Sequence, residues 1–482
     1  MSYVMKKKIQ FDDFQFLPEG GRACYFYTNY LILRMYTRKN HPWSLGIGAV
    51  GNSKNHEVSW YLAVENEKVF DAYLQRFVND SKRLQKLENY ITKTSESTVK
   101  RLKGKDYSSL NQKTILSLLM LYYNSFESIL LAAATIRLVD RALITKLRSL
   151  LNGSANVDER IRLISMNDRI GISLSEEIAL LQLARDSISK KIPLNSKMIQ
   201  KRLKNIADKY CWSTMGYYNE RARTLSDYQK VLKKMIKGHP LRKLQEIRKR
   251  HRDDEKARAD ALKKLPASSR MYAKIAARCA SIKDYFKFSV NEMTYFAEPL
   301  FEEIARRTKI KASFLKDLSP DEITSLFQGK KINRMLVRAR NAHHIGVVFP
   351  TFFQILAGKE ARNFENRYLK VQNHRQNEFR GRVACAGFAR GKAKVILQRK
   401  DFSKMKKGDI LVATNTSPDF IPLIRKAAAI VAEEGGLTAH VSVVSREFGV
   451  PAIVGIPHIT KILKDGDLVE VDARKGVVRK LE

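Results

Sequence analysis

The stretch EEGGLTAHVSVVSREFGVPAIVGI, residues 433–456, decides how the C-terminal part of this chain is interpreted. Two glycines follow the apolar run AAAIVA, and an amphipathic segment begins at Thr438, whose hydroxyl can cap a helix. His440 then falls in the first turn, where free backbone N–H groups and the positive end of the helix dipole stabilise an anion. The motif therefore predicts a phosphoryl group on the imidazole of His440. An ordinary surface histidine in a strand–turn–helix unit is the alternative.

Further segments with their own patterns surround this motif. Together they resemble the phosphohistidine swivelling domain, the mobile domain of phosphoenolpyruvate-utilising enzymes such as phosphoenolpyruvate synthase, pyruvate phosphate dikinase and rifampicin phosphotransferase. The segments that carry the resemblance are GFARGKAKVI (387–396), GDILVATNTSPDF (408–420), KAAAIVAEEGGLTAH (426–440), SREFGVPAIVG (445–455) and DGDLVEVDARKGVV (465–478).

The resemblance implies the role of the histidine. In that family the histidine of the GG-x-T-x-H pattern is phosphorylated, which falls here on His440, and the rest of the pattern is filled by Gly435, Gly436 and Thr438. The family usually has small residues directly after the histidine, whereas this chain has Val441 and Ser442, a departure that leaves the nucleophile intact. The implied function is a phosphotransferase component, similar to phosphoenolpyruvate synthase, that carries a phosphoryl group from a nucleotide-binding partner to an acceptor.

The residues themselves also predict an α/β domain here. Short apolar or β-branched runs bounded by Gly, Pro and Asp indicate strands, and DGDLVEVDARKGVVRKL (465–481) is typical of a hairpin. DFIPLIRKAA and TAHVSVVSREFG carry apolar residues at helical spacing. The glycine-rich turn should therefore lie at the carboxyl end of a strand, where open α/β sheets hold ligands. Asp419, in the TSPDF turn, is either a helix N-cap or a phosphate contact.

The length of 482 residues predicts two or three domains. We expect a multidomain α+β protein: a mixed, strand-containing segment over 1–70, a mostly helical linker or acceptor-binding region over 71–378, and an α/β phosphohistidine swivelling domain over 381–482. The segment around 273–353 resembles the helical linker that precedes the swivelling domain in phosphoenolpyruvate-synthase-like proteins. GIGAVG (46–51) matches GxGxxG, but a turn and a strand-like run follow it, so we interpret it as a hairpin turn.

The net charge of +40 supports a competing hypothesis. Residues 381–482 hold 18 Lys and Arg against 11 Asp and Glu, which leaves 71 against 38, or +33, in the first 380 residues. Such an excess favours phosphate backbones, phosphorylated ligands or an acidic partner. The alternative function is therefore a non-catalytic basic protein that binds nucleic acid or an acidic partner, with a regulatory swivelling domain. A basic surface that is merely solvated is a further possible interpretation of the charge. We rank nucleic-acid binding below phosphoryl transfer as the function.

The composition and the motifs limit which cofactors this chain can bind and in which cellular compartment it is expected. Four cysteines without a CxxC pair or metal-ligand spacing indicate reduced thiols in a cytoplasmic protein and predict no metal site. The N-terminus shows no secretory signal pattern. Neither an ATP-grasp domain nor a GxxxxGK[ST] loop is recognisable, so we expect ATP and Mg²⁺ to be held by a separately encoded ATP-grasp protein and no cofactor by this chain. The sequence leaves the identity of the acceptor, such as a small molecule, open.

Two further segments need interpretation. Residues 115–136 are apolar and long enough to span a bilayer, but Glu127 lies at their middle, so we expect a buried core helix and no membrane association. His343 and His344 are interpreted as helix-end histidines near a Gly346 cap, and an anion site with the neighbouring arginines is the alternative.

Overall fold

The computed structural model describes the chain apart from residues 1–14, 24–47, 55–56, 65–67, 81, 152–156, 167–168, 216–220, 350–351, 370–376, 398, 415, 417–419, 434–439, 457–458 and 482. Two compact units are present, which we describe separately. The helical unit consists mainly of Ala63–Ala361, and the C-terminal unit mainly of Arg362–Glu482. The chain is thus helix-rich before an α/β C-terminal part, as the sequence predicts.

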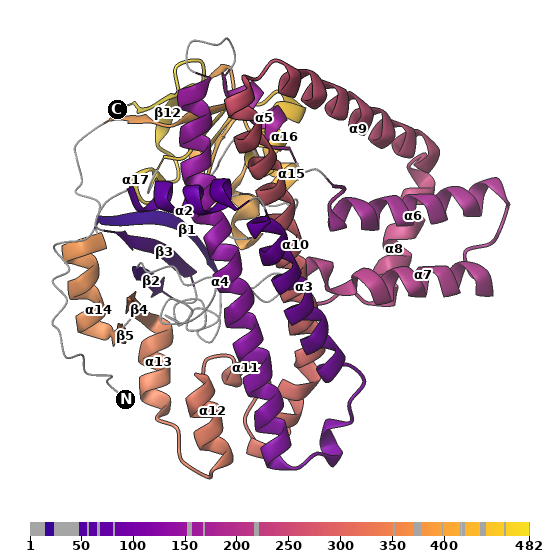
Figure 1. Ribbon diagram of the computed structural model, residues 1–482, viewed down its shortest axis with the longest axis vertical. Helices are drawn as coiled ribbons and strands as arrows, with labels where there is room; N and C mark the ends of the chain where they lie inside the picture. The colour runs from indigo at the N-terminus through magenta and orange to yellow at the C-terminus, as the bar shows by residue number, and fades with distance from the viewer. Residues whose placement is uncertain are drawn as a thin grey trace. The chain divides into compact units, whose positions relative to one another are not determined.

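Three long helices form the centre of the helical unit: α3 (Arg83–Leu102), α4 (Gln112–Leu150) and α10 (Ala267–Thr308). They pack against one another and against α2 (Lys68–Asn79) (Figure 1). Tyr122 and Tyr123 of α4 meet Phe301 of α10 edge-on, at ring distances of 5.8 and 6.2 Å. Aromatic side chains of this size bury large apolar areas, which explains why two such long helices stay together.

Helix α4 contains the apolar segment 115–136. By length and composition it is the one helix in the described part of the chain that could cross a membrane, and 72% of its most apolar window is buried. Glu127 is 1% exposed, and the helix begins at an Asn111 side chain that accepts a hydrogen bond from the backbone N–H of Thr114. The burial of this helix against α10 and α3 is the arrangement expected of a core helix.

Four helices form a second cluster in the same unit: α6 (Ile172–Ser189), α7 (Lys197–Tyr210), α8 (Leu225–Lys237) and α9 (Pro240–Lys263) (Figure 1). We call it the α6–α9 arm. Its apolar core includes Leu180, Leu203 and Tyr228. The remaining elements of the unit are η3 (Tyr107–Ser109), α5 (Val157–Ile164), η4 (Cys211–Thr214), α11 (Ala312–Leu315), α12 (Pro320–Phe327), α13 (Arg334–Ala342) and α14 (Gly358–Phe364).

A five-stranded sheet has the order β1-β3-β2-β4-β5. The hairpin-turn interpretation of residues 46–51 is wrong for the described residues 48–51, which belong to strand β2 and pair antiparallel with β4, Gly51 opposite Gly346. The partner strand lies almost 300 residues away in the sequence, so no local pattern could reveal it. The strands are β1 (Gln15–Ala23), β2 (Gly48–Lys54), β3 (Glu57–Val64), β4 (His343–Phe349) and β5 (Phe352–Ala357).

The interpretation of the two neighbouring histidines needs correction as well. Helix α13 ends at Ala342 with His343 as its C-cap, so the helix-end position is confirmed, but Gly346 is no cap, because His343, His344 and Gly346 all lie in β4. Both histidines are buried, and His344 Nδ1 lies 2.7 Å from the carbonyl oxygen of Arg340. The Arg340 guanidinium in turn donates to the Glu322 carboxylate at 3.0 and 3.1 Å. This arginine is therefore already neutralised by an acidic side chain, which weakens the anion-site alternative.

The C-terminal unit is built on an eight-stranded sheet of order β6-β13-β12-β8-β9-β10-β11-β7. The four strands β8 to β11 run parallel, and the outer strands pair antiparallel. The hairpin predicted over 465–481 is confirmed by the β12–β13 pair. The strands are β6 (Glu378–Arg380), β7 (Arg382–Cys385), β8 (Phe388–Val395), β9 (Ile410–Ala413), β10 (Ala429–Ala432), β11 (Ala452–Val454), β12 (Leu468–Asp472) and β13 (Val477–Lys480).

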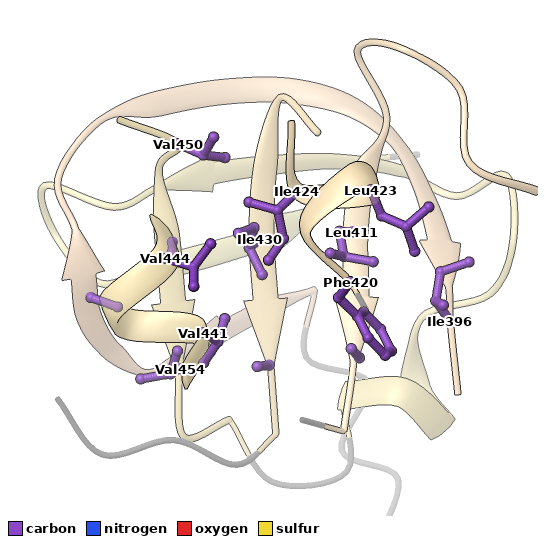
Figure 2. Close-up of a cluster of buried hydrophobic side chains, with 14 of the residues drawn as sticks. Ile396, Leu411, Phe420, Leu423, Ile424, Ile430, Val441, Val444, Val450 and Val454 are labelled. Carbon is purple, nitrogen blue, oxygen red and sulfur yellow. The ribbon is translucent and has the colours of Figure 1, made fainter. Parts of the chain in front are cut away.

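Both faces of the strands β9, β10 and β11 are buried. Alternate residues of β9 point to opposite faces, so Leu411 belongs to one apolar cluster and Ile410 to the other. Figure 2 shows the first cluster, in which Val441 and Val444 lie against the sheet. The helical elements of the unit are η5 (Glu365–Leu369), η6 (Arg399–Lys404), α15 (Ile421–Ile424), α16 (His440–Phe448) and α17 (Ile459–Ile462).

Candidate functional site

The carboxyl ends of the parallel strands define the candidate site. The chain leaves β10 at Ala432, and its next helix, α16, begins at His440. The backbone of His440 therefore occupies the N-terminal end of a helix that follows a parallel strand, the place that the sequence assigned to it. The side chain of His440 and the residues Gly435, Gly436, Thr438 and Asp419 lie outside the described residues, so their roles stay predictions.

Helix α16 packs against the sheet of the C-terminal unit. Val441 and Val444 are 2% and 5% exposed and pack on the sheet, while Ser442 and Ser445 are fully buried (Figure 2). Arg446 donates a hydrogen bond of 3.2 Å to the carbonyl oxygen of Ala384 in β7. The valine that departs from the small-residue pattern after the histidine is thus a core residue. Packing of these valines on the sheet fixes the direction of the helix.

Backbone hydrogen bonds bring the strand ends together. The N–H of Glu433 donates to the carbonyl oxygen of Ala413 at 3.1 Å, and the N–H of Ile456 donates to that of Ala432 at 3.2 Å. The segments that follow β9, β10 and β11 therefore start from one edge of the sheet. Carboxyl ends of parallel strands meet at such an edge, which is where open α/β sheets place their ligands.

Glu433 is a residue of this edge that the sequence reasoning did not single out. Its half-buried carboxylate accepts hydrogen bonds from the backbone N–H of Thr460, at 3.0 Å, and from the Thr460 hydroxyl. Burial raises the pKa of the Glu433 carboxyl, and the bonds to Thr460 and the charge of Lys461 oppose that shift. Glu433, which lies two residues before Gly435, thus links the end of β10 to α17 through hydrogen bonds. The one available signal was a carboxylate between an apolar run and a glycine pair.

We expect Glu433→Gln to change how stability depends on pH. Because the pKa is raised in the folded state, ionisation of Glu433 costs folding free energy above that pKa, and the cost disappears as the carboxyl takes up a proton. Wild type should therefore gain stability relative to Glu433→Gln as the pH falls from about 7 toward about 4. Melting temperatures of both proteins across this range measure the difference.

Thr460→Val serves as the companion variant. It removes the hydroxyl donor but keeps the backbone N–H, and leaving a carboxylate short of one partner should cost about 1–3 kcal/mol at neutral pH. A stability difference between wild type and Glu433→Gln that is constant with pH would show that Glu433 titrates normally.

Comparison with known proteins assigns this part of the chain. Residues 405–476 match the family model of the PEP-utilising enzyme mobile domain. The C-terminal unit contains a PEP-utilising mobile domain. The matched range includes His440.

Phosphoenolpyruvate synthases match about a fifth of the chain. A probable phosphoenolpyruvate synthase of Archaeoglobus fulgidus is 54% identical over 99 residues, which is 20% of this chain and 13% of that protein. The phosphoenolpyruvate synthase of Aeropyrum pernix is 51% identical over 100 residues, covering 20% and 12%. The chain thus spans about an eighth of the length of these relatives. Among solved structures, aconitase X of Thermococcus kodakaraensis in its holo-form aligns with 22% of this chain and all of its own, at 21% identity and a TM-score of 0.18.

The described residues contain no group of three or more His, Cys, Asp or Glu side chains placed to hold a metal ion. Cys211, Cys279 and Cys385 are free thiols. Burial raises the pKa of each of these thiols, which keeps them in the less reactive protonated form at neutral pH.

Proposed function

We propose that this chain is a phosphotransferase component that carries a phosphoryl group on His440 between a nucleotide-binding partner and an acceptor. The observation that carries the proposal is the match to the mobile domain over 405–476, combined with a helix that begins at His440 directly after the parallel strand β10. Gly435, Gly436 and Thr438, from the same motif, are proposed to support the phosphate.

The proposed chemistry divides one transfer into two. A ring nitrogen of neutral His440 attacks the phosphorus of the donor, an N–P bond forms, and the P–O bond to the leaving group breaks. The acceptor oxygen then attacks the same phosphorus, and the electron pair of the N–P bond returns to the imidazole. The free N–H groups of the first turn of α16 favour the added negative charge at this helix end.

The rest of the chain is proposed to serve this carrier. We assign residues 1–70 to a strand-containing segment, 71–378 to a helical linker or acceptor-binding region, and 381–482 to the swivelling domain. ATP and Mg²⁺ are proposed to bind a separately encoded ATP-grasp protein, where the metal would neutralise the phosphate charges.

We expect labelling of this chain to depend on a second protein. Purified chain incubated with radiolabelled ATP and Mg²⁺ should stay unlabelled, whereas addition of a soluble extract of its own host should give a label that is stable in alkali and lost in acid. This stability pattern is that of a phosphoramidate, and serine or threonine phosphate behaves in the opposite way. Gel autoradiography after acid and alkali treatment measures it.

The controls separate the parts of the proposal. An extract passed over a nucleotide-affinity resin should lose its activity, since the donor protein binds ATP. Labelling of the purified chain by ATP alone would place the nucleotide site within this chain. An alkali-labile label, or none with any extract, would overturn the phosphohistidine carrier.

A further inference from the structure

The α6–α9 arm concentrates the positive charge of the chain. Residues 191–264 contain 22 Lys and Arg against eight Asp and Glu, a net charge of +14 over 74 residues. On the surface of α8, Lys230, Lys233, Lys234 and Lys237 are all exposed and recur every three or four residues, so they share one side of the helix. The buried side of α8, with Tyr228 and Leu232, faces the core of the arm.

Helix α7 carries a second row next to the first. Lys197, Lys201 and Lys204 are exposed at helical spacing. The two helices touch through a hydrogen bond of 2.8 Å from Gln229 Nε2 to Gln200 Oε1, and Lys204 and Lys233 each lie one turn beyond their glutamine. Lysines of both helices therefore flank the line where α7 and α8 meet. We call these seven residues the lysine face: Lys197, Lys201, Lys204, Lys230, Lys233, Lys234 and Lys237.

Three acidic side chains of the arm are bound to arginine. Asp186 pairs with Arg202 at 2.9 Å, Asp227 with Arg221 at 2.6 Å, and Glu176 with Arg223 at 2.9 Å. No described carboxylate forms an ion pair with the seven lysines. Asp208 lies one helical turn after Lys204, at the end of the row of lysines on α7. The positive charge of the face is thus left for a partner.

Helix stability does not account for this pattern. Lys197 and Lys201, Lys230 and Lys234, and Lys233 and Lys237 are like charges four residues apart, which repel each other and weaken a helix. Lys197 also stands in the first turn of α7, where the helix dipole disfavours a cation. A bound polyanion would relieve both penalties.

We propose that the lysine face binds the phosphate backbone of a nucleic acid. Lysine is depleted in protein–protein interfaces, whose energy comes from central aromatic and apolar anchors. Asn205 and Ser226 are polar outward positions beside the two rows, and the exposed apolar side chains of α7 and α8 are Met198 and Leu225, with no aromatic anchor among the described exposed residues of these helices. Contacts from Lys and Arg to phosphates, by contrast, supply most of nonspecific nucleic-acid binding. This function is independent of phosphoryl transfer by His440.

The test is fluorescence anisotropy of the full chain with a labelled single-stranded RNA and a duplex of the same sequence, from about 50 to about 200 mM salt. Each phosphate contact contributes about −0.7 to −0.9 to the slope of log affinity against log salt, so we expect a slope of about −3 or steeper. Changing Lys230, Lys233, Lys234 and Lys237 together to Gln should reduce that slope by about 3 and weaken binding at least about tenfold.

A charge-matched variant controls for net charge. Lys309, Lys311, Lys330 and Lys331 are exposed in the same unit, and changing all four to Gln should leave the slope within about one unit of wild type. A second variant with Lys197, Lys201 and Lys204 changed to Gln repeats the test on α7 if the first fails to fold. His440→Ala should bind as wild type does.

Three results would overturn the proposal. Equal losses of nucleic-acid affinity in the lysine-face variants and the charge-matched variant would show that binding depends on the net charge of the chain and not on the lysine face. Competition by poly-glutamate as effective as that by RNA would assign the face to an acidic protein. If no nucleic acid binds at about 50 mM salt, the lysine face is only a solvated surface.

Discussion

His440→Ala is expected to abolish acid-labile phosphoryl labelling of this chain completely. The variant removes the proposed nucleophile, without which the covalent phosphoryl intermediate cannot form. We expect the fold to be kept, because Val441 and Val444 attach this helix to the sheet. Labelling in host extract, with circular dichroism and melting temperature as folding checks, measures the effect.

His251→Ala is the matched control, because His251 is a surface histidine of α9, 38% exposed and 3.4 Å from Glu255. It should label as wild type does. Full labelling of His440→Ala would assign the phosphate to another residue. Loss of labelling in both variants would mean that removal of any histidine disturbs the transfer, and the assignment to His440 would fail.

Leu411→Ala should strongly destabilise the C-terminal unit. Leu411 is fully buried in the central strand β9, within the cluster that also holds Ile430 and Val444 (Figure 2). Truncation of a buried leucine loses transfer free energy and leaves a cavity, at a cost of about 3–5 kcal/mol. Hydrogen exchange followed by mass spectrometry on peptides from β9 and β10 reports the stability of this unit within the full chain.

Leu468→Ala makes the same chemical change in the same sheet, but Leu468 is 44% exposed at the start of β12. Its cost should stay below about 1 kcal/mol. Equal effects of the two substitutions would show that the apolar cluster around Leu411 is not the source of stability of the unit.

The candidate site could be predicted in part from local sequence. The glycine pair, the threonine and the amphipathic run place the start of a helix close to His440, and α16 does begin there. Glu433 could not be recognised in the same way. Its partner Thr460 lies on another element, 27 residues further along, and only the folded sheet brings the two together.

Periodicity and turn chemistry in the sequence determined the α/β character of the C-terminal unit, the β12–β13 hairpin and the helical character of the region before it. Tertiary structure alone decided that Gly48–Lys54 pairs with His343–Phe349, and that the carboxylate of Glu176 is satisfied by Arg223, Ser213 and Tyr228. The physical reason is the separation along the sequence over which each kind of interaction acts. Helix caps, turns and apolar periods act between residues a few positions apart, whereas strand pairing and buried polar networks depend on which distant segments the hydrophobic core brings into contact.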